Sequence, residues 1–176
     1  MRRATFLSTP LKLTGEIRRF CATLSEAEPV VLKAVPFPGC DGECWENLPG
    51  QIQRFGGQGL AGWRIVVWPR VMLHAEPHLV WHSPKDELID VTATPDRAPH
   101  AVFVADPKAA DRPAPVRQAL TNDGDLARWM ALAAAEQEGT DAGMAAFAKV
   151  LKKFARPNDP CHCGSGRQMR KCHPLR

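Results

Sequence analysis

The sequence predicts an α+β fold, in which an antiparallel sheet accompanies N-terminal helices and a small helical segment follows. Three observations predict it. Apolar residues near the start recur with helical spacing, a strand-rich block runs from Gly62 to Val104, and an alanine-rich region follows a cluster of prolines. The chain has 176 residues, 44% of them apolar and 24% charged, and this composition argues against a disordered, collagen-like or coiled-coil protein.

The first predicted domain covers residues 1–105. Apolar residues at positions 17, 20, 21 and 24 form one face of a helix expected over 16–24. Pro29 to Val35 is a β-branched run bounded by prolines and is typical of a strand. Pro, Asp and Gly clusters then separate four more predicted strands, namely Trp63–Trp68, Pro77–Ser83, Glu87–Thr92 and Ala101–Ala105.

The second half of the chain reads differently. Residues 106–117 are proline-rich and predict a linker. The segment 118–155 is alanine-rich and predicts two helices, Asp123–Ala135 and Asp141–Ala155, interrupted at Gly139.

Positive charge is concentrated at the C-terminal end. From Lys149 to Arg176 there are eight lysines and arginines against one aspartate, although the formal net charge of the whole chain is only +4. Such a basic end favours an anionic partner, for example nucleic acid, a ribosome surface, anionic lipid or an acidic protein. The alternative is a solvated helix end that contributes only solubility.

Cysteine usage and the absence of long apolar runs indicate a cytoplasmic protein. No apolar run approaches the roughly 18 residues that a membrane-spanning helix needs, and none of secretory length precedes Pro10. We therefore expect no membrane span. In a reducing compartment the six cysteines are expected to be metal ligands, a catalytic thiol or core residues rather than disulfides.

The last twenty or so residues, 156–176, predict a small zinc-binding module. Cys161, Cys163, Cys172 and His173 supply three thiolates and an imidazole, which complete a tetrahedral structural zinc site. Gly164 and Gly166 allow the backbone between the two ligand pairs to turn sharply. A segment this short buries too little apolar surface to fold alone, so the free energy of zinc binding would have to stabilise it.

This segment resembles the SEC-C motif, the zinc-binding tail of the preprotein translocase ATPase SecA. The resemblance covers the asparagine-aspartate-proline lead-in at 158–160, the glycine pair and all four ligand positions, while His162 stands where the family usually has proline. It implies Zn²⁺ at these four residues and a recognition role, because such tails dock on acidic partners, including a chaperone and the ribosome. The chain lacks a phosphate-binding loop and is too short to be a motor.

A second group of residues predicts thiol chemistry in the first domain. Cys44, His78 and Asp90 occur in the order nucleophile, general base and orienting carboxylate. His78 and Asp90 flank a predicted hairpin turn, and a turn centred on Pro84 places them directly opposite each other. A slip of one residue would separate them onto opposite faces.

Cys44-Trp45, with His78 and Asp90 on neighbouring strands ahead of Thr94-Pro95, resembles the transglutaminase-like core of the papain-like cysteine hydrolases. The resemblance implies a cysteine that opens a helix and acyl transfer on an amide or peptide bond. Pro49 and Gly50 fall inside that helix and predict that it is short.

Other interpretations of these residues stay open. The scaffold could be a degenerate form of the fold, or the three residues could be unrelated core residues, since cysteine is among the most buried residue types. His74 and His82 compete with His78, and Cys40 competes with Cys44. Cys40 and Cys44 could also belong to a second metal site. The sequence therefore supports two hypotheses, a zinc-tailed binding protein and a cysteine hydrolase or acyltransferase.

Overall fold

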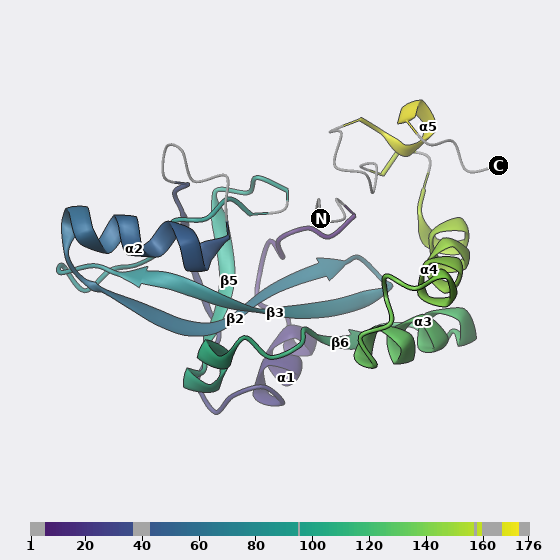
Figure 1. Ribbon diagram of the computed structural model, residues 1–176, viewed down its shortest axis with the longest axis horizontal. Helices are drawn as coiled ribbons and strands as arrows, with labels where there is room; N and C mark the ends of the chain where they lie inside the picture. Colours follow the sequence, from purple (N-terminus) through teal and green to yellow (C-terminus); the bar gives the residue numbers. More distant parts are fainter. Residues whose placement is uncertain (1–5, 37–42, 95, 157, 160–166, 173–176) are drawn as a thin grey trace.

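The computed structural model describes residues 6–36, 43–94, 96–156, 158–159 and 167–172 (Figure 1). The protein is a mixed α+β structure, as predicted. Its elements, in chain order, are α1 (Gly15–Ala22), β1 (Val30–Ala34), α2 (Cys44–Phe55), β2 (Gln58–Trp68), β3 (Met72–His82), β4 (Leu88–Asp90), β5 (His100–Ala105), the 3₁₀ helix η1 (Pro107–Asp111), β6 (Val116–Ala119), α3 (Gly124–Ala134), α4 (Asp141–Phe154) and α5 (Met169–Cys172).

Five strands close into a barrel. They follow the order β2-β5-β1-β4-β3, and the pairing of β3 with β2 completes the ring. The expectation of an antiparallel sheet is wrong at one pairing, because β1 and β4 run parallel, with Lys33 opposite Ile89. A parallel neighbour requires a long connection, and the chain supplies one through α2, β2 and β3.

The inner face of the barrel changes character along its length. Alternate residues of a strand share a face, and the residues around Phe103 form an apolar cluster with Leu32, Val80 and Ala101, against which Leu60 and Leu88 pack. Further along β2, β3 and β4, the residues on this same face are polar. They lie two or four positions from Leu60, Val80 and Leu88, and they are Arg64, Glu76, His78 and Asp90. The barrel therefore has an apolar end and a polar end.

Helix α1 covers the outside of the barrel. The Thr14 hydroxyl accepts a hydrogen bond from the Ile17 N–H and caps the helix. Ile17, Phe20 and Cys21 are buried and pack against outward-facing strand residues, including Trp63, Ile65, Val102 and Val104. The helical spacing seen in the sequence is this packing face.

Helix α2 is longer than expected. It spans Cys44 to Phe55 and continues through Pro49 and Gly50. One face of the helix, which includes Cys44 and Leu48, is buried, and α2 packs mainly against β3. Packing of this face stabilises the helix despite the hydrogen bond that proline cannot donate.

The segment expected to be a linker, 106–117, is part of the folded domain. Its 3₁₀ helix η1 packs on β2 and β3, and β6 begins at Val116 and pairs with β3. Asp106 anchors the segment, because its carboxylate accepts hydrogen bonds from the Trp63 indole N–H at 2.8 Å and from the Lys108 N–H. Three prolines suited a linker in the sequence, but they are equally compatible with a short 3₁₀ helix and an edge strand.

The two C-terminal helices agree with the sequence. α3 and α4 pack against each other at the far end of the β2–β3 ribbon from α2 (Figure 1). Buried aromatic residues join them to the barrel, with Phe6, Trp68 and Trp129 in one apolar cluster. Cys161, Cys163 and His173 of the predicted zinc module lie outside the described residues, while Cys172 is the last residue of α5.

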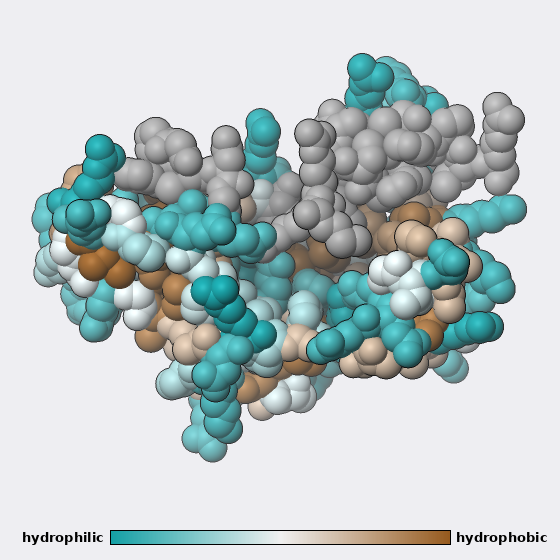
Figure 2. Space-filling view, in the orientation of Figure 1, coloured by the Kyte–Doolittle hydropathy of each residue, from teal (hydrophilic) through white to brown (hydrophobic). Residues whose placement is uncertain are grey.

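No helix in the described ranges is both long enough and apolar enough to cross a bilayer. The viewed surface is mixed, with hydrophobic patches beside hydrophilic areas over α2 and over the two C-terminal helices (Figure 2).

A substitution at Gly62 tests whether the barrel is closely packed at this position. A Cβ at this position would lie 2.3 Å from the Val104 carbonyl oxygen and 2.4 Å from the Phe103 ring. We expect Gly62→Ala to lower the free energy of unfolding by about 2 kcal/mol, within the range for overpacked cores, in chemical denaturation. Gly50→Ala is the matched control, since nothing lies within 4 Å of its Cβ position, and we expect it to be neutral or stabilising by up to about 1 kcal/mol. Equal effects of the two changes would contradict this account.

Candidate active site

Cys44 is the first residue of α2 and lies against the barrel. Glu43, the residue before it, is extended, so the thiol sits in the first turn of the helix, where unpaired N–H groups create positive potential. The residue is only 2% exposed. Its sulfur accepts a hydrogen bond from the Leu79 N–H at 3.4 Å.

A gap in the hydrogen-bonded edge of β3 makes that contact possible. β6 pairs with residues 72–75 of β3, and β4 pairs with Trp81 and His82. Leu79 lies between these two pairings, so its N–H is available to the thiol. The backbone of Pro77, two residues earlier, faces the same edge of β3. Because proline has no N–H, this position leaves no unpaired donor at that edge.

His78 and Asp90 form a buried hydrogen-bonded pair. The His78 Nε2 lies 2.9 Å from the Asp90 Oδ2, and the two side chains are 1% and 0% exposed. His78 and Asp90 therefore lie together, as the sequence predicts. His78 also acts on the Cys44 thiol and lowers its pKa.

The register that joins them differs from the prediction. His82 faces Leu88, so the turn is centred on Lys85 rather than on Pro84. The Ser83 N–H donates to the Glu87 carbonyl oxygen, so the loop consists of the three residues 84–86. Asp86, at its end, has a left-handed φ of 65°. The shift moves His78 and Asp90 from opposed to diagonal positions, yet they stay on one face because each partner changes by two residues.

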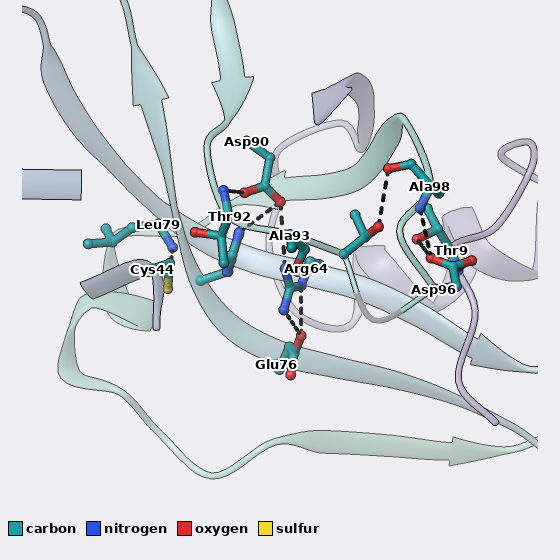
Figure 3. Close-up of polar contacts among 12 residues, drawn as sticks. Thr9, Cys44, Arg64, Glu76, Leu79, Asp90, Thr92, Ala93, Asp96 and Ala98 are labelled. Carbon is teal, nitrogen blue, oxygen red and sulfur yellow. Dashed lines mark hydrogen bonds and ion pairs between the residues drawn. The ribbon is translucent and has the colours of Figure 1, made fainter. Parts of the chain in front are cut away.

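Further polar groups hold the Asp90 carboxylate (Figure 3). Its Oδ1 accepts a hydrogen bond from the Thr92 N–H at 2.9 Å. Its Oδ2 lies 3.7 Å from the Nη1 of Arg64, which in turn makes a close ion pair with Glu76 on β3.

These surroundings favour a thiolate at Cys44. Burial is the largest single influence and by itself would raise the pKa of the thiol. The hydrogen bond and charge of His78, the Leu79 N–H and the charge of Arg64 outweigh burial, and the pKa of Cys44 lies below its usual range.

The imidazole and the carboxylate are also shifted toward their charged forms. Burial and the Arg64 charge oppose an imidazolium, but Asp90 and the Cys44 hydrogen bond outweigh them and raise the pKa of His78. Burial would raise the pKa of Asp90, whereas His78, Arg64 and the Thr92 N–H together lower it. The arrangement suits a thiolate and imidazolium pair supported by an ionised carboxylate.

Competing residues have other partners. The His82 Nε2 bonds the Asp86 carboxylate at 2.7 Å and its Nδ1 lies 3.3 Å from Gln58, so it does not share in the Asp90 contact. His74 is buried four positions before His78 and pairs in register with Arg117 of β6, away from α2. Cys40 lies outside the described residues.

Three groups at the site, Arg64, Thr92 and the Leu79 N–H, are not among the residues that the sequence pattern predicts there. Arg64 carried a usable signal, since a charged residue in a run of apolar strand residues requires a buried counter-charge. The backbone donor had no signal in the sequence, because the gap in the β3 edge depends on where β4 and β6 pair.

No protein-family model, curated protein or solved structure matches this chain. In the part of the chain that the structure describes, no group of three or more His, Cys, Asp or Glu side chains could hold a metal ion.

Cys44 and Cys21 should titrate in different ranges. Both are buried, but burial raises the pKa of Cys21 to about 11, whereas the pKa of Cys44 is lowered. We expect the thiolate absorbance lost in Cys44→Ser to develop below the pKa of a free cysteine, about 8.5. The absorbance lost in Cys21→Ser should develop only at strongly alkaline pH. His78→Ala should move the Cys44 titration upward, and a Cys44 titration indifferent to His78 would contradict the assignment.

Proposed function

We propose that the barrel domain is a cysteine-dependent acyl-transfer enzyme, a hydrolase or acyltransferase acting on an amide or ester carbonyl. The observation that carries this proposal is the buried, hydrogen-bonded His78–Asp90 pair, which acts on the Cys44 thiol and lowers its pKa. A nucleophile, a general base and an orienting carboxylate connected in this order are the requirements of nucleophilic acyl transfer.

The chemistry follows from the roles of the three residues. The Cys44 thiolate adds to the substrate carbonyl carbon, and the His78 imidazolium gives its proton to the departing amine or alkoxide as the carbonyl re-forms. The product is a thioester on Cys44. His78, now neutral, takes a proton from water or an acceptor amine, which attacks the thioester and releases the thiolate. Asp90 keeps the imidazole in one orientation and stabilises its charged form.

Burial of the Cys44 thiol limits which substrates can be used to test the proposal. Cys44 is 2% exposed, so a bulky acyl donor reaches it only if neighbouring side chains move. A small activated ester is therefore the best first probe.

The test uses p-nitrophenyl acetate with the full chain. We expect a burst of p-nitrophenolate equivalent to the protein present, and one acetyl group on Cys44 by mass spectrometry of peptides. Cys44→Ser should abolish the burst, and His78→Ala should slow acylation by about a hundredfold or more. Cys21→Ser is the control and should behave as the wild type, because its thiol is buried without an activating imidazole. An unchanged burst in Cys44→Ser would overturn the proposal.

A second proposal concerns the C-terminal end. The donor set of Cys161, Cys163, Cys172 and His173 suits a structural Zn²⁺, and such an ion would supply folding free energy rather than an open catalytic position. Basic residues flank these positions in the sequence, with Lys152 and Lys153 in the last turn of α4 and two more cations in α5. We propose that this zinc-binding tail binds an anionic partner in the cytoplasm, such as a ribosome, a chaperone or another acidic protein.

Metal analysis tests the tail. We expect a single zinc ion per chain after dialysis of the wild type and a loss of that zinc in Cys172→Ser, because a tetrahedral thiolate site loses most of its affinity with one ligand. Cys21→Ser should keep its zinc. Full zinc content in Cys172→Ser would remove Cys172 from the ligand set.

A further inference from the structure

Arg64 is the largest of the fully buried side chains, with 1% of its surface exposed. It lies on β2, on the inner face of the barrel, where Leu60 is apolar four positions earlier. A guanidinium in such a place loses its hydration and is tolerated only beside compensating negative groups.

Two carboxylates compensate it. The Glu76 Oε1 lies 2.7 Å from the Arg64 Nε and 2.6 Å from its Nη2. The Nη1 points the other way, 3.7 Å from the Asp90 Oδ2 and 3.4 Å from the Ala93 carbonyl oxygen. The side chain of Arg64, from β2, thus lies between Glu76 on β3 and Asp90 at the end of β4 (Figure 3).

The contact with Asp90 involves the same oxygen that His78 uses. The Asp90 Oδ2 accepts from His78 at 2.9 Å and faces Arg64 at 3.7 Å. Stability alone gives no reason for this arrangement, because replacing a buried ion pair by apolar residues is often neutral or stabilising. Glu76, which is directly opposite in the register, already provides a counter-charge without involving Asp90.

We propose that Arg64 is a positioning residue for the Cys44 site, which holds the Asp90 carboxylate in place and limits how strongly that carboxylate retains the His78 proton. This inference rests on the proposed function, since it concerns the proton that His78 must release to the leaving group. Glu76 serves in turn to fix Arg64.

The charges around His78 set the expected direction. Cys44 comes from α2, Arg64 from β2, Glu76 from β3 itself and Asp90 from β4. The Arg64 charge acts to lower the pKa of His78, while Asp90 acts to raise it. Removing the guanidinium leaves the attraction of Asp90 unopposed, so the imidazolium should persist to higher pH.

The experiment follows the ring resonances of His78 by NMR across a pH titration, with assignment by His78→Asn. In Arg64→Met the titration midpoint of His78 should move to higher pH. In Arg64→Lys, which keeps the charge, it should stay closer to the wild type. Glu76→Gln is the matched control, since it removes the other partner of Arg64 but leaves the positive charge beside Asp90, and its midpoint should not rise.

The double variant Arg64→Met/Glu76→Gln removes both members of the ion pair, so that the Glu76 charge does not remain after the Arg64 charge is lost. Its His78 midpoint should also rise. If it instead returns to the wild-type position, the shift in Arg64→Met comes from the Glu76 carboxylate that has lost Arg64, and the proposal is wrong. An unchanged midpoint in folded Arg64→Met would overturn it as well.

Acylation kinetics provide an independent readout. With p-nitrophenyl acetate, Arg64→Met should show a lower plateau rate, because Asp90 is less well held, and an alkaline limb displaced to higher pH. A purely structural role would lower stability without displacing the alkaline limb. The NMR titration needs no turnover, so failure of acylation at Cys44 would contradict the proposed function and still leave the effect of Arg64 on His78 measurable.

Discussion

Mutual compensation of charges inside the barrel is the constraint on which the site depends. None of the buried groups could be placed there alone, because an unpaired charge in this interior carries a large desolvation cost. Arg64 comes from β2, Glu76 and His78 from β3, and Asp90 from β4. Closure of the ring through the β2–β3 and β3–β4 pairings brings these groups within contact distance. The fold and the site therefore depend on each other. Closing the barrel buries these charged groups, and only the closed barrel brings each of them to a partner of opposite charge.

Much of the secondary structure could be predicted from local patterns. The ends of α3 and α4 differ from their predicted ends by at most one residue. The signals for these helices are local, since apolar residues recur with helical spacing and Asp123 and Thr140 cap the first turns. Barrel closure and the parallel β1–β4 pairing were not predicted, since they depend on contacts between distant segments. Proline was misleading twice. Pro49 does not end α2, because the buried face of the helix stabilises it. The prolines after Asp106 belong to a folded segment, because they are compatible with its 3₁₀ helix and edge strand.

The site was predicted in part, and parity explains why. The assumed turn was centred one residue too early, which changes every pairing in the hairpin by two positions. An even change preserves the face of each side chain, so His78 and Asp90 still meet, now diagonally. Placement of Cys44 beside them required the helix at 44–55 and the gap in the β3 edge, of which the resemblance implied only the helix. The apolar neighbours of Arg64 in the strand indicate a buried charge, but its partner Glu76 follows only from the β2–β3 register.

Cys21 and Cys44 show what sets the direction of a thiol pKa shift in this fold. Cys21 is 0% exposed and Cys44 2% exposed, so burial is nearly the same for both. Around Cys21 the apolar contacts between α1 and the barrel dominate, and burial raises the pKa of its thiol to about 11. At Cys44 the His78 imidazole, the Leu79 N–H and the charge of Arg64 together favour the thiolate. Exposure therefore does not explain why the pKa values of the two thiols shift in opposite directions. The groups near each sulfur do, and the charged groups near Cys44 are present because the polar end of the barrel requires each of them to balance the others.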